Sequence, residues 1–327
     1  WGVRLAGTGS AVPDQVLTNA DFERMVDTTA EWIEQRTGIL ERRIVDPTVE
    51  GTHTLSRDAL GRALESAGVR ANELDLIIVA TCTGEMGCPS VAARVSNDLG
   101  AAPSGAFDLV AACSGFVYAM NVADSLIRSG RHRAIGVVGC DAMSTIIDYE
   151  DRSVSILFGD AAGSAILLRD DDPSRGCVHQ CLQGDGAMWE SLYIPRRPID
   201  VPESDRDNRI RLGCLRMNGR EVFRFAVTKF REVIQDALTA TNLTAADIGQ
   251  FICHQSNIRI IDAAVEKLGL PREKVYVNID RFGNSSAGSV GLCLDQLWRA
   301  GRVPLDRHFM MVAFGGGLTW ASSVWKP

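Results

Sequence analysis

The fold prediction rests on the strand-to-helix turn in the stretch Asp108-Leu109-Val110-Ala111-Ala112-Cys113-Ser114-Gly115-Phe116. An apolar, strand-like run ends there on a cysteine, and small residues and a helical pattern follow. A cysteine in such a turn lies at a helix N-terminus, where unpaired backbone N–H groups and the helix dipole favour its thiolate. The stretch therefore predicts a nucleophile, and the alternative is a small buried apolar side chain, the usual fate of a cysteine.

Apolar β-rich runs alternate with amphipathic helical patterns along the chain, which is typical of an α/β fold. Four of the runs predict buried strands, and four of the amphipathic patterns predict helices. The strands are expected at residues 74–80, 134–139, 164–168 and 309–314, and the helices at residues 90–99, 115–128, 221–240 and 258–267.

An internal repeat divides the chain into two similar halves. The motif Arg-Ser-Gly-Arg at residues 128–131 recurs as Arg-Ala-Gly-Arg at residues 299–302, an offset of 171 residues. The same offset takes Cys113 onto Asn284, in a second turn rich in small residues, and takes the end of an N-terminal strand onto His254. Chance matches between short apolar runs are the alternative, but three reactive or polar residues at equivalent turns favour duplication of one βαβ plan.

Two such halves, packed about a pseudo-twofold axis, bring equivalent turns together at the centre. Cys113, His254 and Asn284 are therefore expected to meet. We divide the chain into an N-terminal half with the cysteine (residues 1–170), a connecting segment rich in Pro, Arg and Asp (residues 171–212) and a C-terminal half with the histidine and asparagine (residues 213–327).

Composition excludes several classes of protein. Among the 327 residues, 46% are hydrophobic and 23% charged, and no apolar run approaches the ~20 residues that cross a bilayer, so a soluble globular chain without a membrane partner is expected. The net charge of −7 disfavours nucleic acid as a partner. Nine cysteines without a regular framework predict reduced thiols in the cytoplasm. Metal binding is not expected, because the cluster Cys177-x-His179-x-Cys181 lacks the spacing of a zinc site.

A thiol, a histidine and an asparagine suit covalent acyl transfer, in which the thiol holds the acyl group as a thioester. This reaction also needs hydrogen-bond donors for the oxyanion. The run Ala313-Phe314-Gly315-Gly316-Gly317-Leu318-Thr319 ends a predicted strand, and its glycines let backbone N–H groups approach a substrate closely. A simple glycine turn is the alternative for this run, and a structural role in the core is the alternative for His254.

With these motifs, the sequence resembles β-ketoacyl-acyl carrier protein synthase III, the initiating condensing enzyme of bacterial fatty acid synthesis, within the thiolase-like superfamily. The resemblance extends over the whole chain and includes Gly7-Thr8-Gly9-Ser10, Glu31 to Ile39, Phe158-Gly159-Asp160 and Phe314 to Trp320. It implies a five-layered αβαβα fold made of two duplicated halves and a homodimer. It also implies that the protein uses no cofactor and no metal, and that CoA thioesters are substrates.

The family's reaction joins an acyl-CoA primer to malonyl-acyl carrier protein with loss of carbon dioxide. The resemblance implies that Cys113 carries the acyl group and that His254 and Asn284 hydrogen-bond the malonyl thioester carbonyl. It also implies that the N–H groups of Cys113 and Gly316 form the oxyanion hole and that Phe314 helps to expel the carboxylate.

Further positions match the family's binding residues. For the CoA and pantetheine chain these are Trp32, Arg36, Thr37, Arg152, Met217, Gly219, Phe223 and Asn257. The positions that match residues expected to dock the acidic carrier protein are Arg224, Arg259 and Lys267, with an ordinary solvated charged face as the alternative.

The largest departure from the family is Cys88, where some members carry a phenylalanine that reaches across the dimer and shortens the acyl pocket. The smaller cysteine predicts longer or bulkier primers than acetyl. Two other functions remain open at this point: a related condensing enzyme or acyltransferase of a secondary, polyketide pathway, and a non-catalytic acyl-binding protein.

Overall fold

A five-stranded mixed sheet forms the core of the N-terminal half. The computed structural model describes residues 1–327, and the sheet has the strand order β1-β7-β6-β4-β5. Strands β5 and β6 run parallel to β4, whereas β7 runs antiparallel to both of its neighbours, β6 and β1. The strands are β1 (Gly2–Ala11), β4 (Leu76–Ala80), β5 (Gly105–Leu109), β6 (Ala134–Ala142) and β7 (Asp160–Asp170).

A second sheet repeats this plan with the strand order β11-β12-β13-β8. Its strands are β8 (Gly176–Gly184), β11 (Ile248–Cys253), β12 (His308–Gly315) and β13 (Thr319–Lys326). β11 and β12 are parallel, and β13 is antiparallel to β12 and β8, so β8-β13-β12-β11 corresponds to β1-β7-β6-β4. A parallel bridge from Phe251 to Val275 continues the match at the place of β5. This correspondence of strand order and direction agrees with the predicted duplication.

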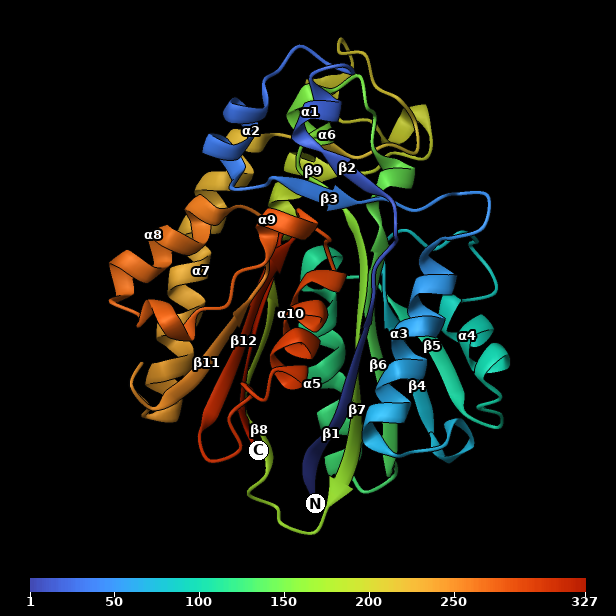
Figure 1. The fold of residues 1–327 in the computed structure, drawn as a ribbon, viewed down its shortest axis with the longest axis vertical. Coiled ribbons are helices and arrows are strands. Elements are labelled where there is room, and N and C mark those ends of the chain that lie inside the picture. Colours follow the sequence, from blue (N-terminus) through green and yellow to red (C-terminus); the bar gives the residue numbers. More distant parts are fainter.

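Helices fill three layers around the two sheets (Figure 1). α5 (Gly115–Arg128) and α10 (Gly288–Arg299) lie between the sheets, α3 (Thr52–Ala67) and α4 (Val91–Leu99) cover the outer face of the first, and α7 (Gly219–Thr241) and α8 (Ile258–Leu268) cover the second. All eight elements predicted from periodicity are present with ends close to the expected ones. None of the helices combines the length and the apolar composition needed to cross a bilayer.

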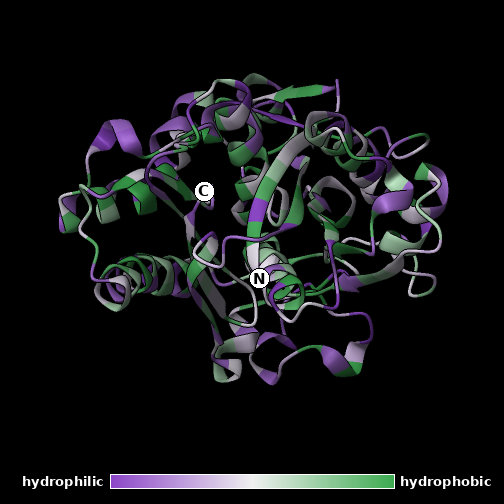
Figure 2. Ribbon diagram, turned by 90° about the horizontal axis from the view of Figure 1, so that it is seen from below, coloured by the Kyte–Doolittle hydropathy of each residue, from purple (hydrophilic) through white to green (hydrophobic).

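The main core lies around the two central helices. A cluster of 26 buried residues joins α5 and α10 to strands of both sheets, and hydrophobic segments lie mostly in the interior of the ribbon (Figure 2). α10 contacts β7 through glycines: a Cβ on Gly163 would lie 2.1 Å from the carbonyl carbon of Gly291. This close approach brings the start of α10 to the junction of the two halves.

Short elements gather over one end of the sheets, at the top of Figure 1. They belong to the segments that follow β1, β6, β8 and β11 in the chain. Their bounds are β2 (Val16–Thr18), α1 (Asn19–Phe22), α2 (Ala30–Thr37), β3 (Glu41–Arg43), α6 (Arg152–Ser155), β9 (Leu192–Tyr193), β10 (Arg216–Met217) and α9 (Ile279–Phe282).

Part of the predicted connecting segment belongs to the second sheet. Residues 176–184 form β8, the edge strand that pairs with β13. A search for continuous apolar runs does not find this strand, because it lies at the edge of the sheet and Val178 and Leu182 alternate with polar residues along it. The three-part division of the chain stays a prediction.

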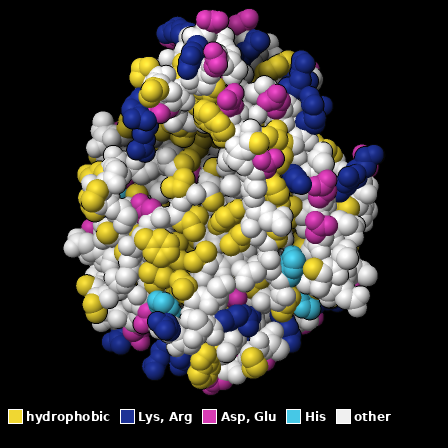
Figure 3. Space-filling model, turned by 180° about the vertical axis from the view of Figure 1, so that it is seen from behind, with side chains coloured by type: hydrophobic (Ala, Val, Ile, Leu, Met, Phe, Trp, Pro, Cys, Tyr) yellow, Lys and Arg dark blue, Asp and Glu magenta, His cyan; other side chains and the backbone are white.

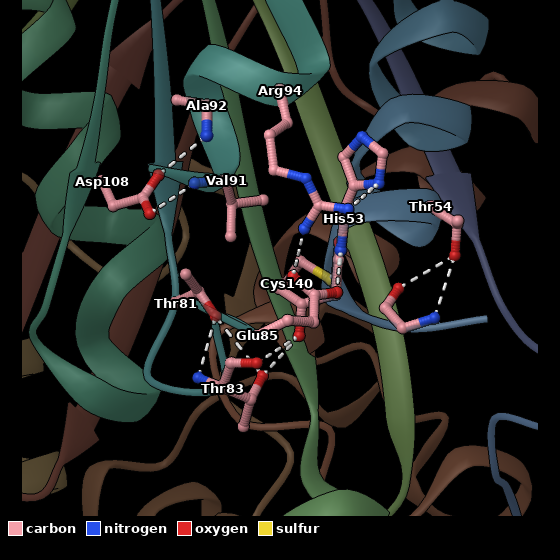
Figure 4. A network of polar contacts seen from close by, with 12 residues as sticks. His53, Thr54, Thr81, Thr83, Glu85, Val91, Ala92, Arg94, Asp108 and Cys140 are labelled. Atoms are coloured by element: carbon pink, nitrogen blue, oxygen red, sulfur yellow. Dashed lines mark hydrogen bonds and ion pairs between the residues drawn. The ribbon is translucent and has the colours of Figure 1, made fainter. Parts of the chain in front are cut away.

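Asp108, at the start of the stretch around Cys113, anchors β5 to the next layer. Its carboxylate accepts hydrogen bonds from the N–H groups of Val91 (2.7 Å) and Ala92 (2.9 Å) in the first turn of α4 (Figure 4). An acidic side chain at a helix N-terminus satisfies N–H groups that have no partner inside the helix. The strand that leads to Cys113 is therefore fixed to α4 before the chain turns.

Candidate active site

Cys113 lies in an abrupt turn between β5 and α5. Ala112, just before it, has a left-handed backbone with φ of +46°, which L-residues rarely adopt. The side chain of Cys113 is buried, and its Sγ lies 3.3 Å from the Oγ of Ser286. The predicted strand-turn-helix geometry around the cysteine is therefore present.

Burial outweighs the helix N-terminus in setting the charge of this thiol. It raises the pKa of Cys113 to about 12, although the Ser286 hydroxyl acts in the opposite direction. The thiol is therefore protonated at neutral pH in the free protein. A helix N-terminus adds only a modest favourable field, whereas loss of water penalises the anion strongly.

His254 follows β11 and extends its pairing with β12. Its N–H donates to the carbonyl of Val312 over 2.8 Å, and its Nδ1 lies 2.7 Å from the Oγ of Ser289. The ring meets that of Phe314 edge-on, with 5.3 Å between centroids. Burial lowers the pKa of His254 to about 3, so the imidazole is neutral at physiological pH.

Asn284 is held by the chain that precedes β7. Its N–H donates to the carbonyl of Leu157 (2.9 Å), and its own carbonyl accepts from the N–H of Gly159 (3.1 Å). The side-chain Oδ1 accepts a hydrogen bond from the N–H of Ser286 over 2.9 Å. This bond leaves the amide nitrogen of Asn284 as the group that donates to a bound molecule.

These side chains line one mostly apolar cavity. It has a volume of about 640 Å³, its open mouth included. Such a cavity, apolar with a few polar groups, is typical of a ligand site. The predicted residues that it brings together are Cys113, His254, Asn284, Phe314, Met217, Gly219, Phe223 and Asn257.

The glycine run at the end of β12 lies against the backbone of Cys113. A Cβ on Gly315 would lie 2.6 Å from the nitrogen of Cys113, a contact that only glycine permits. Neither the N–H of Cys113 nor that of Gly316 donates to another backbone carbonyl. Backbone N–H groups without backbone acceptors are suited to an oxyanion.

Trp32, Arg36 and Arg152 come together away from the cavity lining. Trp32 is 39% exposed, and the guanidinium carbons of Arg36 and Arg152 lie 5.6 and 5.4 Å from its ring centroid. Thr37 differs from them, because it is buried and its hydroxyl donates to the carbonyl of Ile33 over 2.6 Å. Its predicted contact with substrate stays a prediction.

Asn257 connects the cavity to this aromatic and basic group. Its Nδ2 donates to the carbonyl of Arg36 over 3.0 Å, and its Oδ1 accepts from the N–H of Arg259 over 2.9 Å at the start of α8. The guanidinium carbon of Arg259 lies 5.6 Å from the ring centroid of Phe223, which lines the cavity. The end of α2 and the start of α8, joined by Asn257, thus form one side of the approach to the cavity.

The three predicted docking residues are all exposed. Arg224 follows the cavity residue Phe223 on α7, and Arg259 is in the first turn of α8. Lys267 lies eight residues further along α8, about 12 Å from Arg259 at 1.5 Å per residue. Cys88 is exposed in the single chain and is not among the residues that line the cavity.

Three polar residues of the site were not singled out from the sequence. Ser286 and Ser289 contact Cys113 and His254, and Asp141 is a fully buried carboxylate. Asp141 accepts from the N–H of Cys82 (2.8 Å) and from the N–H of Ala287 (3.1 Å), so it ties the turn after β4 to the start of α10. Ser286 lies two residues after Asn284 in the same turn and Ser289 lies in the first turn of α10, so their closeness to Asn284 in the sequence is a signal that could have drawn attention to them, although it does not indicate which side chain each one contacts.

Comparisons with known proteins agree with this geometry. Family models of 3-oxoacyl-[acyl-carrier-protein (ACP)] synthase III match residues 107–186, and of its C-terminal part residues 238–327. A β-ketoacyl-[acyl-carrier-protein] synthase III of Caldanaerobacter subterraneus subsp. tengcongensis is 43% identical over 322 residues, covering 98% of this chain and 97% of the relative. The chain belongs to the β-ketoacyl-[acyl-carrier-protein] synthase III family. As a synthase III family member, it is a condensing enzyme of the acyltransferase type.

Solved synthase III structures share the fold. The crystal structure of 3-oxoacyl-[acyl-carrier-protein] synthase III from Aquifex aeolicus is 40% identical, with a TM-score of 0.92 and full coverage of both chains. A priming β-ketosynthase from the R1128 polyketide pathway is 37% identical, with a TM-score of 0.90 and coverage of 99% of this chain and 96% of that one. The predicted thiolase-like, five-layered fold of two duplicated halves is confirmed.

Proposed function

We propose that this enzyme starts fatty acid synthesis by condensing an acyl-CoA primer with malonyl-acyl carrier protein. The products are 3-oxoacyl-acyl carrier protein, CoA and carbon dioxide. The observation that carries the proposal is the convergence of a thiol, a neutral imidazole and a carboxamide on one apolar cavity, from turns of both halves. Membership of the synthase III family supports the same reaction.

In the first half-reaction, Cys113 becomes acylated. A bond forms from its sulfur to the acyl carbon, the bond from that carbon to the CoA sulfur breaks, and the thiol proton ends on CoA. The transfer needs no net uptake of protons, which suits a thiol with a raised pKa. The N–H groups of Cys113 and Gly316, free of other acceptors, stabilise the oxyanion of the tetrahedral intermediate.

In the second half-reaction, the malonyl group loses carbon dioxide. The electrons of the broken bond form an enolate, and His254 and Asn284 donate hydrogen bonds to its oxygen. Its carbon then attacks the Cys113 thioester, and the released sulfur takes up a proton. Phe314, which lines the cavity beside His254, offers the carboxylate an apolar surface and favours its departure as neutral carbon dioxide.

The approach to the cavity suits a CoA thioester and a carrier protein. Partly exposed Trp32 offers a flat surface to the adenine base, and Arg36 and Arg152, whose guanidiniums lie near its ring, offer charge to the CoA phosphates. Met217, Gly219, Phe223 and Asn257 would line the pantetheine arm. Exposed Arg224, Arg259 and Lys267 suit an acidic carrier protein, with Arg259 beside the cavity mouth.

A homodimer forms part of the proposal. Strand β5 is an unpaired sheet edge, and Phe107 and Val110, within and just after it, are 38% and 77% exposed. Hydrophobic side chains also gather across the middle of one face of the molecule (Figure 3). An edge strand flanked by apolar groups favours pairing with a second copy. In such a dimer, exposed Cys88 would leave room in the partner's acyl channel for primers larger than acetyl.

The chemistry needs no cofactor, because the protein thiol carries the acyl group between the two steps. No group of three or more His, Cys, Asp or Glu side chains is arranged to hold a metal ion. All nine cysteines are free thiols, which suits a reducing compartment such as the cytoplasm.

A second candidate function is the priming condensation of a polyketide pathway. It is supported by the likeness to the priming β-ketosynthase of the R1128 pathway. Both functions use the same three residues, so they differ in primer and in carrier protein.

The deciding experiment combines intact mass spectrometry with product analysis. The protein is incubated with a mixture of acyl-CoAs, mapped by peptides, and then given malonyl-acyl carrier protein. One acyl adduct on Cys113, followed by release of a 3-oxoacyl product, supports the proposal, and the mass of the adduct identifies the primer. Absence of both an adduct and a product would favour a non-catalytic acyl-binding protein. Cys113→Ala is the matched control for the adduct.

A further inference from the structure

We propose that Ser289 is a positioning residue that fixes the tautomer of His254, with the proton on Nε2. The ring then presents an N–H donor to the cavity and not a lone pair. This inference rests on the proposed function, in which His254 stabilises the enolate of the malonyl group. It assigns Ser289 to one of the two half-reactions.

The contact between these residues is short and isolated. Ser289 is fully buried in the first turn of α10, and its Oγ lies 2.7 Å from Nδ1 of His254. The hydroxyl forms no other hydrogen bond, either to a side chain or to a backbone carbonyl. His254 is buried too, and Ser289 is the only partner of its ring.

Hydrogen-bond accounting then selects one tautomer. If Nδ1 carried the proton, it would donate to Oγ, and the hydroxyl hydrogen of Ser289 would stay buried without an acceptor. If the hydroxyl donates to a bare Nδ1, both buried groups are satisfied. The second arrangement is favoured, because a buried donor without a partner is costly. A neutral ring has one ring proton, so it must lie on Nε2.

The same turn orients the second donor. Asn284 accepts the N–H of Ser286 on its Oδ1, which leaves its amide nitrogen to donate. Residues 284–289 therefore set the direction of two hydrogen bonds, one through a backbone N–H and one through a serine hydroxyl. Donors fixed before the substrate arrives cost little reorganisation when negative charge develops on the enolate.

This arrangement separates the two half-reactions. Decarboxylation places negative charge on the oxygen that His254 and Asn284 contact, whereas acylation of Cys113 places it near the backbone N–H groups of Cys113 and Gly316. Loss of the Ser289 hydroxyl should therefore slow decarboxylation and leave acylation nearly unchanged. A purely structural role would lower both rates together.

The kinetic test compares Ser289→Ala with Ser164→Ala. Ser164 is equally buried, lies in β7 and donates to the carbonyl of Val137 over 2.9 Å, so its variant loses a buried hydroxyl outside the cavity. We expect Ser289→Ala to lower the rate of carbon dioxide release from malonyl-acyl carrier protein by tenfold or more, and the rate of Cys113 acylation by less than about threefold. Loss of a donor itself costs about 100- to 1,000-fold, which sets the upper limit.

Rescue supplies a further readout. Ser289→Thr keeps the hydroxyl, so it should retain more decarboxylation activity than Ser289→Ala. Equal losses in both half-reactions, or an unchanged rate of carbon dioxide release in Ser289→Ala, would overturn the proposal. The Ser164→Ala protein is expected to keep wild-type rates in both.

An NMR measurement tests the tautomer without any substrate. The chain has only five histidines, and in wild-type protein labelled with ¹⁵N-histidine the signal of His254 is assigned by its absence in His254→Gln. We expect a proton on Nε2 at neutral pH, and a proton on Nδ1 would overturn the proposal. Failure of wild-type protein to decarboxylate malonyl-acyl carrier protein would refute the proposed function, whereas the NMR signal would still decide the tautomer.

Discussion

Gly315→Ala should damage catalysis far more than it damages stability. The added Cβ would lie 2.6 Å from the nitrogen of Cys113 and 3.1 Å from that of Ser114. Ordinary contacts begin at 3.4 Å, so the end of β12 and the Cys113 turn must separate by about 0.8 Å. Both sides are backbone and cannot rotate away. Because a shift of about 1 Å at a reacting group costs about 100-fold, we expect kcat/KM for condensation to fall by about two orders of magnitude.

The stability cost of this overpacking should be about 1–3 kcal/mol, measured by urea unfolding. Acylation of Cys113 should also slow, because the displaced N–H groups serve the acyl oxyanion. Gly186→Ala is the matched control, since its Cβ would meet no atom within 4 Å. A Gly315→Ala protein with wild-type kcat/KM would refute the argument that this close approach sets the position of Cys113.

Three further predictions concern charge and substrate binding. Because burial depresses the pKa of His254 to about 3, the unfolded chain binds a proton below about pH 6.5 that the folded chain refuses. As the pH is lowered from about 6.5 to about 3, the free energy of unfolding should therefore fall by about 1.4 kcal/mol per pH unit because of His254. Urea titrations of the wild type should show a steeper loss of stability with falling pH than those of His254→Gln. Burial raises the pKa of Cys113 to about 12, so the rate of its alkylation by iodoacetamide in the free enzyme should keep rising with pH above neutrality and should stay below the rate for exposed Cys88. Peptide mapping measures both rates, and a rate for Cys113 that levels off near pH 7 would contradict this. Trp32→Ala should raise KM for acyl-CoA about tenfold with little change in kcat, since base stacking contributes ~1–3 kcal/mol, and steady-state kinetics would measure it.

The sequence predicted the fold and the three central residues because both depend on local patterns. Strand-to-helix turns with small residues recur at a constant offset, and a twofold arrangement brings such turns together. The structure places Cys113, His254 and Asn284 around one cavity, as the offset required. Their chemical roles stay predictions.

Properties that depend on the three-dimensional surroundings of a side chain could not be predicted from the sequence. The charge of Cys113 follows from how completely other segments remove water from it, and a helix N-terminus seen in sequence does not reveal that loss. Thr37 matches a binding position, yet its hydroxyl is used inside α2. The pairing of Ser289 with His254 joins residues 35 apart in the chain, and nothing in their local patterns indicates it.

The division of the site between the two halves has a consequence for how the chain is made. Cys113 and Asn284 are 171 residues apart, and α5 is covered on one side by strands that come after residue 240. While the C-terminal half is still on the ribosome, the apolar side of α5 that later faces β12 and β13 has no cover. Long-range contacts of this kind form slowly, and exposed apolar surface favours aggregation. A truncated chain that ends before β11 should therefore aggregate unless a chaperone binds it. It would contain Cys113 but neither His254 nor Asn284, so it could not carry out the condensation.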